Sequence, residues 1–372
     1  MEYTKLKEIN KYKSESINPA KTPDTVFEMY SVPIYDTGHP EYLRGDEISS
    51  NKVIVRKNDI LLCKINPRIN RVWVVADESK YTNIASSEWI VVRTEDYNPE
   101  FLAWYFRSIK FQKLMTSEVT GIGGSLTRAQ PKCVAEYPVP ILSRNQQDSI
   151  VEVLNKCKSI IEARKQELAD LDELIKARFV EMFGSMPQNE KGWKIGTIRD
   201  VVKDVHYGSS RKASDDGKYP YLRMNNITDS GELDLTDIKR IDVPDNELDK
   251  CTVRKGDVLF NRTNSKEHVG KTCVYNRDET MVLAGFVVRV RVNEKVIPEF
   301  LSAFLNTSFS KALLYNMCKA AIGQANINAQ ELQSIAIYIP PVELQEEFSK
   351  FKDQVDKSKV VAQIPIEEAE KI

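Results

Sequence analysis

The chain has 372 residues, of which 41% are hydrophobic and 29% are charged, and its 53 Lys+Arg against 54 Asp+Glu give a formal net charge of -1. This length predicts two or three domains, and this composition excludes a disordered or fibrous protein. The balanced charge excludes a uniformly basic protein that coats nucleic acid, but it allows a protein with locally basic surfaces.

The sequence also argues against membrane, disulfide and metal chemistry. Its polar N-terminal residues show no secretory signal, and no stretch of about 18 apolar residues predicts a membrane span. The six cysteines and three histidines are scattered, without a CxxC pair. We therefore expect reduced thiols, a cytoplasmic protein, no membrane partner, no metal and no cofactor.

The most informative feature is an internal repeat. Residues 55–62 read VRKNDILL and residues 253–260 read VRKGDVLF, an offset of 198. The sequence PEFL at residues 99–102 recurs at 298–301, an offset of 199, and VP at 139–140 is answered by IP at 339–340, an offset of 200. A period of this length predicts a duplicated domain and not a solenoid unit.

Each copy is predicted to be mixed α/β. Alternating and β-branched residues predict strands within residues 53–62, 72–76 and 89–92 of the first copy and 286–292 of the second. Apolar residues at helical spacing predict helices over residues 101–115 and 300–317. The predicted fold class is therefore α/β (mixed α+β), with two tandem domains at residues 1–142 and 185–341.

A long helix is predicted between the copies, over residues 143–184. Residues 145–183 contain no Gly or Pro, Asn145 is the expected N-cap, and Gly184 is the expected stop. Residues spaced four and three apart form a coiled-coil seam, in which Cys157, Arg164 and Arg178 accompany the aliphatic positions. Packing against a flanking domain also fits a single helix, but so regular a seam favours a helical partner. The candidate partner-binding residues are Ile150, Leu154, Ile161, Leu168, Leu171, Ile175 and Met182.

A shorter helix is predicted after the second copy, within the C-terminal segment 342–372. It covers residues 342–357, and we expect Pro365 and the acidic residues around it to end the run.

Several local motifs resemble those of one protein family. The second copy contains YPYLRMNNI at residues 219–227, KGDVLFNR at 255–262, VGKT at 269–272 and QANIN at 324–328. The central helix ends in RFVEMFG at residues 178–184. In this order, and together with the duplication, these motifs resemble the specificity (S) subunits of type I restriction-modification systems over nearly the whole chain.

This resemblance implies a particular function. Each copy would be a target recognition domain that reads one half of a split double-stranded DNA sequence. The helices would hold the two domains apart and dock two methyltransferase (M) subunits, and restriction (R) subunits would join the complex. The chain itself would be non-catalytic. The family's second helix normally pairs antiparallel with the first, so the shorter run predicted here leaves the docking of a second M subunit open.

The distribution of charge supports DNA binding independently of the resemblance. Residues 56–71 contain five cations and one anion, and residues 250–271 contain six cations and two anions, so each segment carries +4. Either segment alone would be an ordinary solvated loop. Because they occupy equivalent places in the repeat, we favour contact with DNA phosphates.

Candidate base-reading residues are Arg, Lys, Asn and Gln on the loops, because these side chains match the donors and acceptors of base edges. Two glycine-bearing loops, at residues 121–128 and 321–326, lack the GK[ST] ending of a nucleotide-binding loop. Turns that lead into DNA-facing loops explain both, and plain structural turns explain them nearly as well. The candidate DNA-binding residues are Lys64, Asn66, Arg68, Arg71, Arg128, Ser209, Arg211, Lys212, Arg223, Asn225, Asn226, Arg262, Asn264, Lys266, Lys271, Gln324 and Asn326.

Two other classes of function remain as alternatives. One is a coiled-coil adaptor whose duplicated domains bind protein and read no DNA. The other is a self-contained DNA methyltransferase or nuclease. The chain lacks an Asn/Asp-Pro-Pro-aromatic motif, and the carboxylates near Asp237 and Lys239 have no counterpart in the first copy. We therefore expect no catalytic residues.

Overall fold

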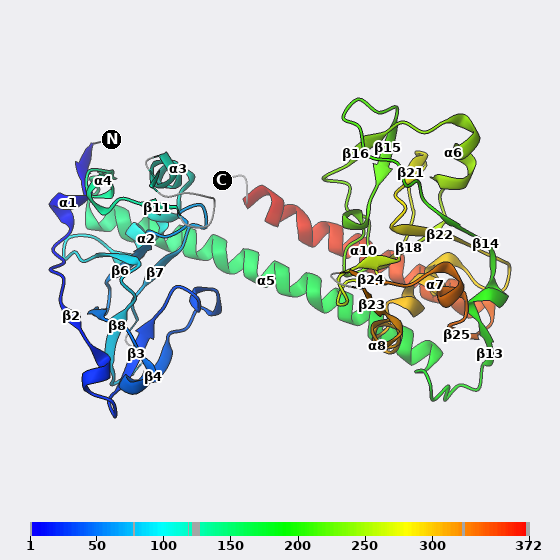
Figure 1. Ribbon diagram of the computed structural model, residues 1–372, viewed down its shortest axis with the longest axis horizontal. Coiled ribbons are helices and arrows are strands. Elements are labelled where there is room, and N and C mark those ends of the chain that lie inside the picture. Colours follow the sequence, from blue (N-terminus) through cyan, green and yellow to red (C-terminus); the bar gives the residue numbers. More distant parts are fainter. Residues whose placement is uncertain (1, 77–78, 118, 121–126, 322–323, 370–372) are drawn as a thin grey trace. The chain divides into compact units, whose positions relative to one another are not determined.

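The computed structural model describes residues 2–76, 79–117, 119–120, 127–321 and 324–369 (Figure 1). The chain divides into two compact units, Met1–Ile160 and Ile161–Ile372, which are called unit 1 and unit 2 below. Both units combine helices with strands, and a long helix lies in the middle of the chain, which confirms the predicted mixed fold class.

Unit 1 is built on two small sheets. A five-stranded sheet has the order β2-β5-β8-β3-β4, and a three-stranded sheet has the order β7-β6-β9, against which α2 packs. The short strands β1 and β12 pair with each other, as do β10 and β11. The elements are β1 (Tyr3–Lys5), α1 (Leu6–Ile9), β2 (Ser16–Ile17), β3 (Val26–Tyr30), β4 (Glu41–Arg44), β5 (Lys52–Ile54), β6 (Ile60–Cys63), β7 (Val72–Val74), β8 (Thr82–Ala85), β9 (Trp89–Val92), α2 (Pro99–Arg107), α3 (Ile109–Ser117), β10 (Val119–Thr120), β11 (Arg128–Ala129), α4 (Pro131–Val134) and β12 (Pro138–Pro140).

Unit 2 repeats this arrangement. Its sheets have the orders β16-β15-β21-β17 and β14-β22-β18-β20, β13 pairs with β25, and β19-β24-β23 form a small ribbon. The elements are β13 (Lys194–Thr197), β14 (Val202–Tyr207), β15 (Tyr219–Leu222), β16 (Lys239–Ile241), α6 (Asp245–Cys251), β17 (Thr252–Val253), β18 (Val258–Asn261), β19 (Thr263–Asn264), β20 (Thr272–Val274), β21 (Met281–Leu283), β22 (Val287–Val292), α7 (Pro298–Leu305), α8 (Ser308–Met317), β23 (Lys319–Ala321), β24 (Gln324–Asn326), α9 (Ala329–Gln333), β25 (Ala336–Ile339) and α10 (Val342–Ala369).

Each unit contains, at an equivalent position, an ion pair between a buried carboxylate and a partly exposed arginine. Arg93 binds Asp59 through two hydrogen bonds of 2.7 and 2.6 Å, and Arg291 binds Asp257 through two of 2.8 and 3.2 Å. The residue numbers differ by 198 in both cases. In each unit the pair joins the turn before the central strand to the end of its neighbour, β6 to β9 and β18 to β22. The repeat in the sequence is thus a repeat of structure.

The strand predicted within residues 53–62 is two strands. β5 and β6 are separated by a tight turn in which Asn58 has φ +70°, and Gly256 occupies the same place in unit 2 with φ +89°. Positive φ breaks extended backbone and favours Asn and Gly. The central strands that follow the turns, β6 and β18, are buried at every position, as expected for strands covered on both faces.

The two helices predicted over residues 101–115 and 300–317 are each a pair of helices. α2 and α3 meet at Ser108, and α7 and α8 meet at Asn306 and Thr307. The Thr307 hydroxyl accepts a hydrogen bond from the Ser310 backbone N–H and so caps a new helix. Apolar spacing continued across both breaks, which is why the pattern read as one helix.

The long central helix, α5 (Arg144–Phe183), covers 40 residues and confirms the predicted long helix between the copies. Its predicted N-cap is wrong. Ser143, and not Asn145, precedes the helix, and its backbone N–H donates to the Gln146 side chain at 3.0 Å while its hydroxyl receives the Gln146 backbone N–H. Gly184 follows the last turn with φ +81°, as expected of a helix stop.

The C-terminal helix α10 is longer than predicted, because it covers 28 residues and Pro365 lies inside it. Proline removes one hydrogen-bond donor, which a helix with a well-packed face can tolerate. That face has a regular seam spaced by three and four, which charged members concealed in the sequence. The seam residues are Gln345, Phe348, Lys352, Val355, Lys359, Ala362 and Ile366, all buried except the partly buried Lys352.

Within unit 2, α10 runs antiparallel to the C-terminal half of α5. Arg178 contacts Glu347 at 3.2 Å, whereas Asp172, nearly two turns earlier, contacts Lys359 at 2.6 Å. The predicted seam residues of α5 in this half are partly buried, except that Arg164 is exposed and Met182 is buried. In unit 1, Leu154 is partly buried and Ile150 is exposed.

Among the polar seam residues of α10, Lys359 forms an ion pair with α5. Its ammonium group lies between Asp172 of α5 and Glu232 of the loop before β16, and the residue is buried. Replacing Lys359 with Met should lower the free energy of unfolding of unit 2 by about 2 kcal/mol, because two partly exposed carboxylates, Asp172 and Glu232, lose a shared cation. Urea unfolding measures this, with the exposed Lys357→Met as the control. Equal stability of the two variants would contradict the role of Lys359.

Candidate nucleic-acid interface

In unit 2, the structure brings together candidate residues from two distant loops. β19 pairs with β24, so that Thr263 lies opposite Asn326 and Asn264 lies opposite Ala325. The Ile327 backbone N–H donates to the Arg262 carbonyl at 2.9 Å and extends this pairing. Arg262, Asn264 and Asn326 therefore share one small ribbon. Gln324 also lies in β24, but its side chain is outside the described part of the chain.

Unit 1 builds the same ribbon from the equivalent loops. The Asn66 backbone N–H donates to the Thr127 carbonyl at 2.8 Å, and the Ala129 N–H donates to the Lys64 carbonyl at 2.9 Å. Arg128 forms an isolated bridge with Ile65. The predicted groups at residues 64–68 and at Arg128 are thus neighbours. We call these two structures the unit 1 ribbon and the unit 2 ribbon.

On the unit 2 ribbon, two cations lie over exposed aromatic rings. The Arg262 guanidinium lies 4.9 Å from the ring centroid of Tyr207, and the Lys266 ammonium lies 4.0 Å from that of Tyr315. Both tyrosines are 44% exposed. Cation–π contact restrains long side chains without neutralising them, so both charges remain available to a ligand.

On the unit 1 ribbon, the cations are held by polar groups. The Lys64 ammonium donates to the Ser87 carbonyl at 2.6 Å, and Arg128 forms two contacts of 3.3 and 3.4 Å with Glu88. Arg68 is exposed beside them, and Asn66 adopts φ +46°. Arg71 is partly buried, and its Nε is buried without a hydrogen-bond partner. The two units therefore present different chemistry on the same framework.

Several candidates in unit 2 are engaged in the fold. Ser209 is 7% exposed and Asn226 is 2% exposed; the Asn226 amide donates to the carbonyls of Asp234 and Asp237. Three cations form ion pairs, namely Arg211 with Glu247 at 2.7 Å, Arg223 with Asp237 at 2.7 Å and Lys271 with Asp229 at 3.4 Å. By contrast, Lys212 and Asn225 are exposed. These assignments remain predictions, but burial and ion pairing together distinguish the candidates that are engaged in the fold from those that are exposed without an ion pair.

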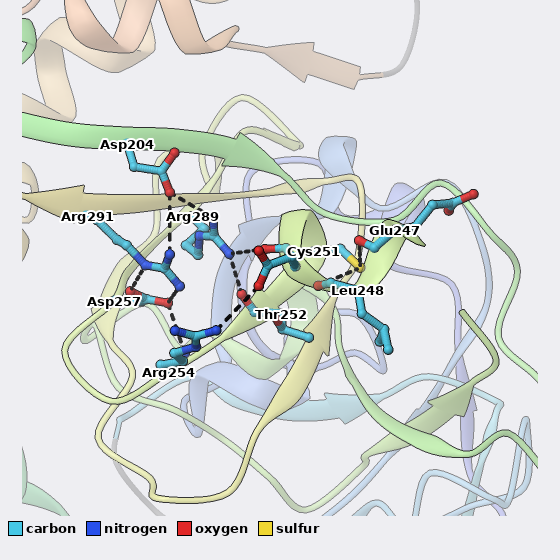
Figure 2. Close-up of polar contacts among 10 residues, drawn as sticks. Asp204, Glu247, Leu248, Cys251, Thr252, Arg254, Asp257, Arg289 and Arg291 are labelled. Atoms are coloured by element: carbon cyan, nitrogen blue, oxygen red, sulfur yellow. Dashed lines mark hydrogen bonds and ion pairs between the residues drawn. The ribbon is translucent and has the colours of Figure 1, made fainter. Parts of the chain in front are cut away.

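A buried arginine that the sequence analysis missed positions part of this surface (Figure 2). Arg289 is 2% exposed; it donates to the carbonyls of Asp249 and Thr252 at the end of α6, and binds Asp204 at 2.8 Å. This anchors α6, whose Glu247 binds Arg211. The equivalent residue of unit 1, 198 positions earlier, is Val91. Comparing the two copies position by position would have revealed this charge, because Val91 is apolar.

Lys311 of α8 contacts the loop that precedes β20, and its pKa is lowered by burial. Its ammonium donates to the Gly270 carbonyl at 2.7 Å, and burial lowers the pKa of Lys311 to about 8, with Asp229 opposing this shift and Lys271 and Lys176 adding to it. The folded state thus binds fewer protons than the unfolded state between about pH 8 and the usual lysine pKa of 10.5. The free energy of unfolding should therefore rise with pH across this window.

Urea unfolding of the wild type and of Lys311→Met between pH 7 and 10 checks this expectation. The wild type should gain stability relative to the variant as pH rises, because the variant has no proton to lose. The matched control is Lys113→Met, an exposed lysine on α3 of unit 1, which should leave the pH dependence unchanged. A constant difference between wild type and Lys311→Met would disprove the shifted titration.

Within the described residues, no cluster of three or more His, Cys, Asp or Glu side chains has the geometry of a metal site. No helix among them combines the length and apolar character needed to cross a membrane.

Comparison with known proteins finds similarity to one family. Residues 190–367 match the type I restriction modification DNA specificity domain. The chain is 28% identical over 177 residues to the putative type I restriction enzyme MjaX specificity subunit of Methanocaldococcus jannaschii, an alignment that covers 46% of this chain and 41% of that protein. It is 21% identical over 271 residues to the type I restriction enzyme EcoKI specificity subunit of Escherichia coli K12, covering 68% and 58%. The chain thus spans about half the length of these curated relatives.

A solved structure shares the fold. It was described in work on complex assembly and conformational transition of the type I R-M system, and the alignment covers 100% of this chain and 94% of that chain. The TM-score is 0.62 and the sequence identity is 19%, so this likeness concerns the fold alone.

Proposed function

We propose that the chain is a specificity subunit of a type I restriction-modification system, because residues 190–367 match the DNA specificity domain of that family and the chain is similar to curated specificity subunits. In this proposal it reads a bipartite double-stranded DNA target and carries no chemistry of its own. Unit 1 would read one half of the target and unit 2 the other. Methyltransferase subunits, two in the complete complex, would modify the DNA, and restriction subunits would join them. The chain would act as the scaffold for both.

The observation that carries this proposal is the repeated ribbon. Each unit pairs the loop after its central strand with a second loop, through the equivalent hydrogen bonds Ala129 N–H to Lys64 and Ile327 N–H to Arg262. A cation stands at the same position of both ribbons, residue 64 and residue 262, and further cations lie nearby. Two equivalent basic ribbons suit two half-sites of one DNA molecule.

Burial, ion pairing and position on the ribbons suggest different roles for the candidate residues. Side chains that are exposed or lie on a ribbon would contact DNA directly, whereas Ser209, Asn226, Arg211, Arg223 and Lys271, which are buried or ion-paired, would hold the loops in place. The proposed direct contacts are Lys64, Asn66, Arg68, Arg128, Lys212, Asn225, Arg262, Asn264, Lys266 and Asn326.

The helices would bind the methyltransferase subunits. On α5, Val153 and Ile160 are exposed in addition to the predicted Ile150, so an apolar face is available to a partner. On α10, Val360, Val361 and Ile364 are exposed in the same way. The 28 residues of α10 favour the docking of a second methyltransferase subunit more than the run of about 16 residues read from the sequence did.

DNA binding as a function of salt tests the proposal. The chain, alone and with its methyltransferase subunits, is titrated onto a DNA library at increasing salt. A protein that reads DNA loses affinity steeply as salt rises: the slope of log affinity against log salt concentration grows in magnitude by roughly 0.9 for each phosphate contact. Replacing both Arg262 and Lys266 with Ala should therefore reduce the magnitude of that slope. If DNA binding is absent both for the chain alone and for its complex with methyltransferase subunits, the proposal is refuted and the protein-binding adaptor is favoured.

A further inference from the structure

At one equivalent position beside the two ribbons, the backbone contact is the same but the side chain differs. The Lys64 backbone N–H donates to the Glu88 carbonyl at 3.0 Å, and the Arg262 N–H donates to the Phe286 carbonyl at 3.0 Å. Arg262 lies 198 residues after Lys64, and Phe286 lies 198 residues after Glu88. Glu88 and Phe286 therefore stand at the same place beside the ribbon, held by a backbone contact that does not depend on their side chains.

In unit 1, this position carries a carboxylate. Glu88 is partly buried and accepts two contacts of 3.3 and 3.4 Å from Arg128, which is also a member of the ribbon. These contacts are long for an ion pair of this kind. The carboxylate oxygens therefore keep acceptor capacity for a further donor.

In unit 2, the same position carries an apolar ring. Phe286 is 49% exposed. The neighbouring Arg262 donates to the Gly285 carbonyl at 3.4 Å and stacks on Tyr207, and no carboxylate of the described residues lies within ion-pair distance of it. An isolated exposed phenylalanine is ordinary on a protein surface. Here, however, it flanks an uncompensated cation on a surface proposed to face base edges.

We propose that residues 88 and 286 determine which base each unit prefers at one position of its half-site. A carboxylate accepts a hydrogen bond from the exocyclic amino group of cytosine, whereas a phenylalanine ring makes apolar contact with the C5-methyl group of thymine. Glu88 would thus select cytosine in the half-site of unit 1, and Phe286 would select thymine in that of unit 2. This inference rests on the proposed function and specifies how it discriminates.

The test exchanges the chemistry of unit 2 in the intact complex. The wild type, Phe286→Glu, Phe286→Leu and Phe286→Ala are each assembled with the methyltransferase subunits, and bound sequences are selected from a randomised library. Phe286→Glu should replace thymine by cytosine at one position, with a change in relative affinity of roughly tenfold. Phe286→Leu should retain the thymine preference, and Phe286→Ala should weaken it. All positions of the other half-site should stay unchanged.

The outcomes separate this inference from the proposed function. If the wild-type complex selects no DNA sequence, the proposed function fails. If the wild type selects a bipartite sequence and both Phe286→Glu and Phe286→Ala select that same sequence with unchanged preferences, the role of residue 286 is overturned. Should Phe286→Glu lose all binding, Phe286→Ala decides: an unchanged thymine preference overturns the inference, and a weakened preference at one position supports it.

Discussion

Replacement of Phe348 by Ala is expected to lower the free energy of unfolding of unit 2 by about 3–5 kcal/mol, the range for removing a fully buried phenylalanine side chain. Phe348 of α10 is 0% exposed, and its ring lies 5.3 Å from that of Phe179 and 5.7 Å from that of Phe183, both from α5. Phe300 of α7 joins the same cluster. The Phe348 ring therefore packs α10 against α5 in the core of unit 2.

Urea unfolding measures this loss of free energy, and hydrogen exchange of the native protein shows which peptides of unit 2 open more readily. The matched control is Val360→Ala on the same helix, because Val360 is 63% exposed and should change stability by less than about 0.5 kcal/mol. α10 should also exchange faster than the sheets in Phe348→Ala. A destabilisation as small as that of the control would show that the aromatic cluster does not anchor α10.

Replacement of Asp257 or Asp59 by Ala is expected to destabilise unit 2 or unit 1, respectively, by about 3 kcal/mol. Each carboxylate is buried, binds an arginine through both oxygens, and accepts a backbone N–H, from Arg254 or Arg56. Its removal leaves the amide without this acceptor and the arginine without its bidentate partner, although in unit 2 Arg291 keeps a contact of 3.6 Å with Asp204. The arginines remain partly exposed, which places the cost at the lower end of the range for broken buried pairs.

The effect of each variant should be confined to its own unit. Hydrogen exchange should show faster opening of β18 and β22 in Asp257→Ala, and of β6 and β9 in Asp59→Ala. Asp278→Ala serves as the control, because its ion pair with Lys255 is on the surface and should contribute less than 1 kcal/mol. If either buried variant matches this control, the repeated ion pair is not a structural element of the fold.

The sequence predicted the large features because they depend on patterns that persist along the chain. The duplication follows from motifs such as VRKNDILL, and the central helix follows from 39 residues without Gly or Pro, 145–183. The extent of α10 was underestimated because Lys352 and Lys359 occupy its seam. Lys359 is compatible with burial only because Asp172 and Glu232 meet it, and those partners are distant in the sequence.

The candidate surface was predictable only in part. Asn225 and Asn226 are adjacent and identical in type, yet Asn225 is exposed and Asn226 is buried by hydrogen bonds to a distant loop. Tyr315, which supports Lys266, lies on another element and gave no local signal. The contrast between Glu88 and Phe286 could have been found by aligning the two copies, but its meaning depends on the ribbon beside them.

The most direct test of the account is the DNA sequence that the assembled complex modifies. The chain is combined with its methyltransferase subunits, genomic DNA is modified, and the methylated sites are identified by sequencing. The account predicts an asymmetric sequence in two parts separated by a gap of fixed length, because two different readers are joined by one helix, α5. A continuous or palindromic site, or modification independent of the chain, would contradict it.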